Sequence, residues 1–178
     1  GGHGNINVVQ AIESSSNVFF YKMGISLGID KMFQYASAFG IGQKTGINLS
    51  NEVPGLMPNS DWKRRQYGEE WQPGENLSNA IGQGFVLTTP LQMALAFNAI
   101  GTEGKLYRPF IVKKLTDHEE KVISEFEPHL VKDLSIPDEN GFFISKPNFK
   151  VVKEGMRRVV NGERGTARWH KLSWVEIA

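Results

Sequence analysis

Serine, lysine and asparagine residues form three short patterns in this chain that are suited to acyl transfer through a serine. That chemistry requires a serine that can be acylated beside a lysine, a second hydroxyl that relays protons, and a further lysine with strand backbone that holds the substrate. Patterns of these kinds occur as Ser60-Asp61-Trp62-Lys63, Ser15-Ser16-Asn17 and Lys44-Thr45-Gly46. At first sight the chain therefore holds a complete site.

Two of these patterns lie in an unsuitable local context. A nucleophilic serine of this kind should begin a buried helix, but the Lys63-Arg64-Arg65-Gln66 run after Ser60 offers no apolar face. A Lys-Thr-Gly triplet should lie on a strand, whereas Lys44 falls in a connection punctuated by glycines. Three-residue patterns recur by chance, so we interpret both as coincidental. The Ser-x-Asn triplet is no stronger by itself, because serine and asparagine are ordinary helix caps.

A further serine pattern and the histidines give weaker signals. Gly24-Ile25-Ser26-Leu27-Gly28 matches the nucleophile elbow of α/β-hydrolases, but that elbow needs a preceding strand and a helix is predicted here. A serine hydrolase that uses Ser26 stays open as an alternative, and it would require a strand ending at Met23. No metal or cofactor is predicted, because no pair among His3, His118, His129 and His170 has the His-x-x-x-His spacing of a zinc site.

Composition limits the class of protein. The 178 residues suffice for one domain with a sizeable core. The 20 basic and 19 acidic residues nearly cancel, so nucleic acid is not an expected partner. The absence of cysteine excludes disulfides and thiolate metal sites. No stretch reaches the roughly 18 apolar residues of a membrane helix, so any anchor is expected outside these residues.

Helices are predicted at four places. Apolar residues in the first third are interrupted at Ser14-Ser15-Ser16-Asn17, which predicts two helices, with Ser16 or Asn17 capping the second. A helix capped by Asp30 is expected to stop at Gly40. Thr88-Thr89-Pro90 predicts the start of another helix, ending at Gly101, and a last helix is expected at about 149–160.

Strands are expected near the end of the chain. Residues 110–112 and 122–126 predict a hairpin with its turn at 117–120, and residues 169–178 predict a final strand. Residues 41–80 are expected to be irregular, because glycine and proline punctuate them. Helices outnumber strands but both occur, so the predicted class is α+β.

Five ordered blocks resemble the transpeptidase domain of class B penicillin-binding proteins. A separate stretch, Trp62 to Trp71-Gln72-Pro73-Gly74-Glu75, resembles the elongation-type members of this family, which build the side wall. Division-type members are the near alternative, and class A enzymes fit less well. The blocks are Ala11 to Tyr21 around the Ser-x-Asn triplet, Phe39-Gly40-Ile41-Gly42 with Thr45-Gly46-Ile47-Asn48-Leu49 and then Glu52, Gly55 and Pro58, Ile81-Gly82-Gln83-Gly84 with Thr88-Thr89-Pro90-Leu91-Gln92, Gly155 to Val160, and Gly165-Thr166-Ala167.

The resemblance implies a fold, a reaction and roles for two residues. The fold is the penicillin-recognising serine transpeptidase fold, an antiparallel sheet flanked by helices, of which this chain is a largely helical part. The reaction is cross-linking of peptidoglycan stem peptides through a serine acyl-enzyme, which β-lactams trap. Ser15 is implied to be the catalytic hydroxyl that relays protons, and Asn17 to bind the amide carbonyl of the substrate.

The resemblance also implies partners and an extent. Partners would be stem peptides, β-lactams, a membrane glycan polymerase and rod-shape proteins, on the periplasmic side of the inner membrane. In the family the nucleophile motif precedes the Ser-x-Asn triplet and the Lys-Thr-Gly strand follows it. Residues 1–178 are therefore expected to be a partial domain that ends just before that strand and is inactive alone. A non-catalytic scaffold domain of the cell-wall machinery is the alternative.

Overall fold

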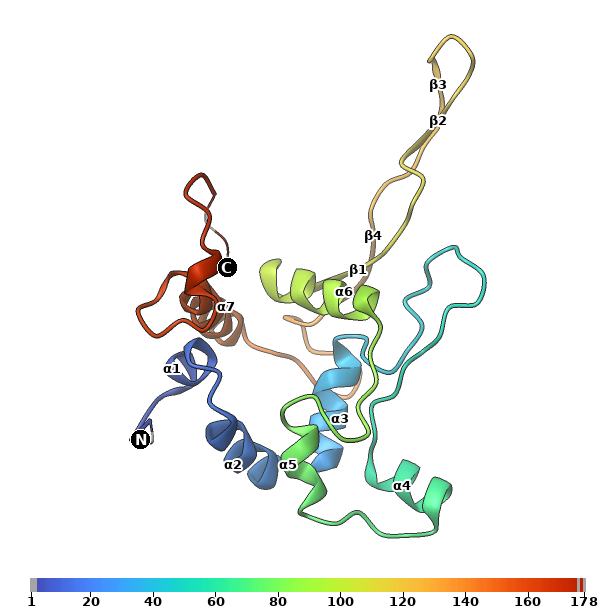
Figure 1. The fold of residues 1–178 in the computed structure, drawn as a ribbon. Helices are drawn as coiled ribbons and strands as arrows, with labels where there is room; N and C mark the ends of the chain where they lie inside the picture. Colours follow the sequence, from blue (N-terminus) through green and yellow to red (C-terminus); the bar gives the residue numbers. More distant parts are fainter. Residues whose placement is uncertain (1–2, 176, 178) are drawn as a thin grey trace.

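The computed structural model describes residues 3–175 and 177. Helices and short antiparallel strands both occur, which confirms the predicted α+β class (Figure 1). The helices are α1 (Val8–Glu13), α2 (Asn17–Leu27), α3 (Ile29–Ala38), α4 (Ser60–Tyr67), α5 (Glu75–Asn79), α6 (Pro90–Gly101), α7 (Lys146–Asn161) and a 3-10 turn (Arg168–His170), and the strands are β1 (Lys105–Arg108), β2 (Lys114–Thr116), β3 (Val122–Glu125) and β4 (His129–Asp133).

Helix α6 forms as its local sequence predicts. The hydroxyl of Thr89 accepts the N–H of Gln92, the side chain of Gln92 accepts the N–H of Thr89, and Pro90 occupies the first turn. The amide of Gln92 is buried and also donates to the carbonyls of Gln43 (2.6 Å) and Pro54 (2.7 Å). One side chain thus caps the helix and ties it to the preceding irregular segment.

The start of helix α3 differs from the prediction. Gly28 has a φ of 74° and is shared as the end of α2 and the cap of α3, so Asp30 lies inside the first turn. A glycine adopts this conformation freely, and no separate capping residue is needed. The carboxylate of Asp30 instead accepts the N–H (2.9 Å) and the hydroxyl (2.8 Å) of Ser60.

Residues 41–80 are less irregular than predicted, because they contain α4 and α5. Asn59 caps α4 by accepting the N–H of Trp62 at 2.7 Å. The two helices are joined by an ion pair, in which Nζ of the buried Lys63 lies 2.6 Å from Oε1 of the half-buried Glu75. Apolar periodicity cannot reveal a helix that is held mainly by a cap and an ion pair.

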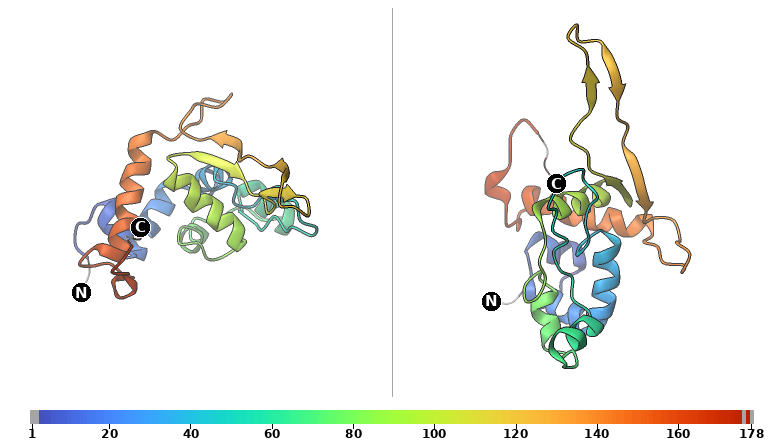
Figure 2. Two further views of the ribbon diagram at one scale, coloured as in Figure 1. Left: turned by 90° about the horizontal axis from the view of Figure 1, so that it is seen from above. Right: turned by 90° about the vertical axis from the view of Figure 1, so that its right-hand side faces the viewer.

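The strands form two antiparallel pairs, β1 with β4 and β2 with β3. Together they make a long ribbon that projects from the helices (Figures 1 and 2). The predicted turn at 117–120 is confirmed, but the strand predicted at 110–112 is wrong. Residues 109–113 face the shorter stretch 126–128, where Pro128 has no N–H to donate, so the ladder is interrupted there.

The end of the described chain also departs from the prediction. Helix α7 begins at Lys146, three residues before its predicted start, and a turn follows it at 162–167. Residues 168–170 form a 3-10 turn and 173–175 form a bend, so no strand occurs among 169–175; residues 176 and 178 of that prediction lie outside the description. No helix among the described residues combines the length and apolarity that spanning a membrane requires.

Two apolar clusters hold the helices together. Ile29, Ile41 and Met57 form one beneath α3, and Leu134, Ile144 and Phe149 form the other at the start of α7. Helix α1 lies against α7 although the two come from opposite ends of the chain (Figures 1 and 2). This packing positions the serine bend.

Candidate active site at the serine bend

The break between α1 and α2 is a Schellman motif centred on Ser15. The N–H of Ser16 donates to the carbonyl of Ala11 (2.9 Å), and the N–H of Ser15 donates to that of Ile12 (3.1 Å). Ser15 has a φ of 50°, in the left-handed region that glycine usually fills at this position. The predicted two helices broken at the serines are therefore confirmed, and a serine is held where its backbone is strained.

The bend presents the two predicted site residues to solvent. Ser15 and Asn17 are exposed, while Ser16 between them is only 4% exposed. Asn17 is the first residue of α2; Ser16 stands at the capping position but its side chain makes no capping hydrogen bond. A neighbouring cavity is lined by His3, Ser16, Val18 and others. The bend thus exposes one hydroxyl and one amide two residues apart in the sequence.

A second hydroxyl approaches the bend from the far end of the chain. Oγ of Ser15 lies 3.1 Å from Oγ1 of Thr166, in the turn after α7. Gly155 permits this approach, because a Cβ at its position would lie 2.8 Å from Cδ1 of Ile12. The absence of a side chain there lets α7 press directly on α1.

Glu13 holds the turn that carries Thr166. It is 7% exposed, and its Oε1 accepts the N–H of Arg164 at 3.1 Å. Its backbone carbonyl accepts the N–H of Thr166 at 3.3 Å. Gly162 fits against the carboxylate so closely that any Cβ there would overlap Oε1. The last residue of α1 therefore binds the turn at two points.

The Ser60 and Lys63 pair is engaged elsewhere. Ser60 begins α4, contrary to the prediction of an irregular segment, but its hydroxyl donates to Asp30. Nζ of Lys63 donates to Glu75 and lies 3.6 Å from Glu69. The hydrogen bond to Glu75 raises the pKa of Lys63, which keeps this lysine protonated and unsuited to act as a base.

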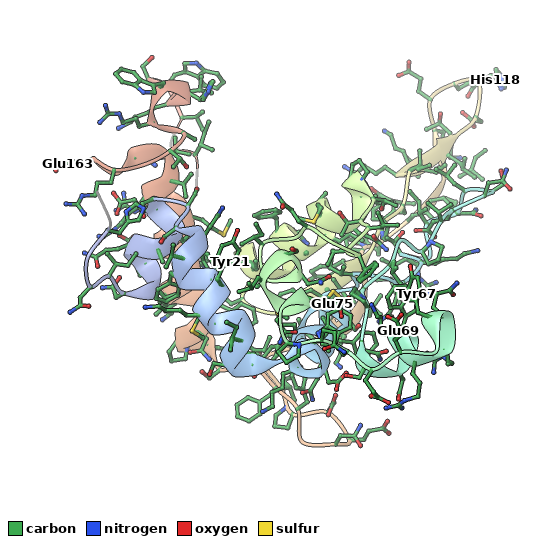
Figure 3. The ribbon with its side chains drawn as sticks, turned by 60° about the horizontal axis from the view of Figure 1, so that its bottom comes forward. Tyr21, Tyr67, Glu69, Glu75, His118 and Glu163 are labelled. Carbon is green, nitrogen blue, oxygen red and sulfur yellow. The ribbon has the colours of Figure 1, made fainter. Side chains whose placement is uncertain are left out.

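Figure 3 shows the surroundings of this ion pair. Tyr67, Glu69 and Glu75 lie together beside α4, well away from Glu163 in the turn after α7. Nζ of Lys63 is 5.1 Å from the ring centroid of Tyr67 and 5.1 Å from that of Phe85. An enclosed cation between carboxylates and aromatic faces indicates a structural role for Lys63.

The other two sequence patterns also lack the surroundings that a catalytic motif requires. Lys44-Thr45-Gly46 lies outside any strand, and Thr45 donates its hydroxyl (2.5 Å) and its N–H (2.7 Å) to Oε1 of Glu52. The Thr45 hydroxyl is the main reason that the pKa of Glu52 is lowered. Ser26 lies inside α2, with no strand before it, so the nucleophile-elbow alternative is wrong. No group of metal-binding side chains gathers within residues 3–175 and 177.

Comparison with known proteins decides the family. A family model described as the penicillin binding protein transpeptidase domain matches residues 1–178. The chain belongs to this family. It is 33% identical over 168 residues to the peptidoglycan D,D-transpeptidase MrdA of Haemophilus influenzae, covering 94% of this chain and 24% of that protein. The MrdA of Escherichia coli K12 is 32% identical over 166 residues, covering 93% and 25%.

Solved structures agree with this family. The penicillin-binding protein PBP2 of Helicobacter pylori, in its complex with MreC, is 31% identical with a TM-score of 0.76, covering 99% of this chain and 29% of that one. PBP2 of Pseudomonas aeruginosa in complex with WCK 5153 is 33% identical with a TM-score of 0.75, covering 92% and 34%. The predicted fold and the predicted family are confirmed. The chain spans about a quarter of the length of its curated relatives.

Sequence reasoning missed two residues of the serine bend. Thr166 was part of a recognised block, but nothing in its neighbourhood pointed to Ser15. Glu13 precedes the serines directly, and a carboxylate at the end of a short helix gives no sign that it is buried. Both become visible only once α1 and α7 are packed together.

Proposed function

We propose that this chain forms the Ser-x-Asn wall of a peptidoglycan D,D-transpeptidase that cross-links stem peptides during side-wall growth. The family and the relatives named MrdA support this proposal. The single observation that carries it here is the serine bend, where an exposed hydroxyl and an exposed amide are held by a strained backbone. Strain of this kind is typical of functional sites.

The proposed reaction is acyl transfer in two steps. A serine oxygen attacks the carbonyl between two D-alanines, forms an ester, and expels the terminal D-alanine, whose amine takes up a proton. An amine of a neighbouring stem peptide then attacks the ester, and the serine regains its proton. Ser15 relays these protons, because a hydroxyl donates and accepts at once. Asn17 donates its amide N–H to the substrate's carbonyl and orients it.

The acylated serine and its lysine are proposed to lie in polypeptide outside these residues. Ser60 and Lys63 have the spacing of a nucleophile motif, but they are engaged by Asp30 and Glu75. The isolated chain should therefore show no covalent penicillin adduct by mass spectrometry. An adduct on Ser60 would overturn this assignment.

Partners and location are proposed by analogy. PBP2 of Helicobacter pylori was solved in complex with MreC, and another similar structure, 34% identical with a TM-score of 0.73, belongs to a peptidoglycan synthase complex that coordinates polymerization and crosslinking. We expect the full protein to work beside a rod-shape protein and a glycan polymerase on the periplasmic side of the inner membrane, and to be a target of β-lactams.

The decisive experiment measures acylation of the full-length protein by a fluorescent penicillin. Ser15→Ala should slow the maximal acylation rate by about 10²–10⁴-fold, the range for general acid–base help. Asn17→Ala should weaken capture of the antibiotic. A protein that is not acylated at all would favour the non-catalytic scaffold, and unchanged kinetics in Ser15→Ala would remove Ser15 from the mechanism.

A further inference from the structure

The hydroxyl of Ser15 has a defined partner in this chain. An exposed serine side chain ordinarily samples three staggered rotamers, and only some of them suit a proton relay. Oγ1 of Thr166 lies 3.1 Å from Oγ of Ser15, which favours one orientation. Thr166 is itself restricted, because a β-branched side chain is stiff at χ1.

The backbone of Thr166 is anchored independently of this hydroxyl contact. Its N–H donates to the carbonyl of Glu13, and the N–H of Arg164 donates to the carboxylate of the same residue. Gly165 is buried against the last carbonyls of α7, so close that a Cβ there would overlap them, and the turn therefore lies directly on the helix. Thr166 is therefore a fixed partner and not a passing surface contact.

We propose that Thr166 is a positioning residue that orients the Ser15 hydroxyl for proton relay, and that Glu13 holds Thr166 in place. The proposal rests on the role of Ser15 put forward above. Thr166 need not touch the substrate. It acts by keeping one lone pair or the proton of Ser15 engaged, so that the remaining donor and acceptor positions point in set directions.

The test compares Thr166→Val with Thr166→Ser in the full-length protein. Valine keeps the shape of threonine and removes the hydroxyl, whereas serine restores it. Thr166 is exposed, so neither change should disturb folding. We expect Thr166→Val to lower the maximal acylation rate by about 5-fold, as the loss of one hydrogen bond near 1 kcal/mol implies, and Thr166→Ser to recover it. Thr116→Val, the same change at an exposed position of β2, is the matched control.

Two readouts separate positioning from a structural effect. A destabilised protein would reach a lower final amplitude of penicillin labelling. Lost positioning instead lowers the acylation rate at full amplitude and leaves the affinity for the antibiotic unchanged.

Glu13→Gln retains an oxygen acceptor for the Arg164 N–H and should acylate faster than Glu13→Ala. Equal rates for these two variants would exclude the proposed role of Glu13.

A double-mutant cycle with Ser15→Ala completes the test. If Thr166 acts through Ser15, adding Thr166→Val to Ser15→Ala should cause no further loss. An equal 5-fold loss in both backgrounds, or a wild-type rate for Thr166→Val alone, would overturn the inference while leaving Ser15 in its role. Unchanged kinetics in Ser15→Ala alone would instead refute the proposed function, and the positioning role with it.

Discussion

Replacing Ser15 by glycine or by alanine tests the left-handed bend directly. Both changes remove the hydroxyl and its contact with Thr166, so that loss cancels between them. They differ in backbone freedom, because Ser15 has a φ of 50°. Left-handed backbone costs an L-residue about 1–2 kcal/mol, and glycine escapes this strain. Glycine loses about 0.5–1 kcal/mol more conformational entropy on folding than alanine does.

The difference predicts that Ser15→Gly is more stable than Ser15→Ala by about 1 kcal/mol. In a domain of this size such a change shifts the melting temperature by about 2–4 °C. Differential scanning calorimetry of the two variants in the same protein measures it. Ser26, exposed within α2, provides the control. There the order should reverse, since glycine inside a helix costs about 1 kcal/mol relative to alanine.

The acylation rates of the same variants provide the second half of the test. Ser15→Gly and Ser15→Ala should slow acylation to the same extent, because neither supplies a hydroxyl, whereas Ser26→Ala should leave it unchanged. An alanine variant as stable as the glycine variant would show that Ser15 is not held in left-handed backbone. A glycine variant with the wild-type acylation rate would show that the hydroxyl relays no proton.

Three further predictions concern the packing and stability of α6 and α7. Gly155→Ala should destabilise the protein by about 1–3 kcal/mol and slow acylation, because its Cβ would lie 2.8 Å from Ile12; calorimetry and penicillin labelling check this. Gln92→Leu should cost about 2–4 kcal/mol in urea unfolding, because it leaves two carbonyls and the N–H of Thr89 without their partner. Glu154→Gln tests pH dependence: hydrogen bonds from the two arginines that follow it lower the pKa of Glu154 to about 2 from 4.5. The stability that this carboxylate adds is therefore complete above pH 4.5 and lost as the pH falls toward 2, so the melting temperatures of wild type and variant should converge over that window.

Elements with strong local signals were predicted correctly from the sequence. Helix α6 combines a capping box, an N-terminal proline and an apolar face within one stretch, and it begins and ends where expected. The break at the serines and the turn at 117–120 are likewise set by residues that are neighbours in the chain. Each depends on hydrogen bonds that span only a few residues.

Predictions failed where partners are distant or where a ladder is interrupted. Helix α4 has little apolar character, and the pair between Lys63 and Glu75 that joins it to α5 crosses an irregular connection. The strand expected at 110–112 has apolar residues of the right type, but the opposing stretch is too short to pair with it. The β-propensity of a segment does not indicate which residues lie opposite it in a sheet.

The amino-acid sequence by itself determined the family and the Ser-x-Asn triplet, because short ordered blocks and local capping chemistry need no knowledge of distant contacts. Only the tertiary structure decided what surrounds that triplet. Thr166 and the buried carboxylate of Glu13 meet Ser15 because Gly155 lets α7 press on α1. Contacts between the two ends of a chain arise from packing, and no periodicity within either segment encodes them.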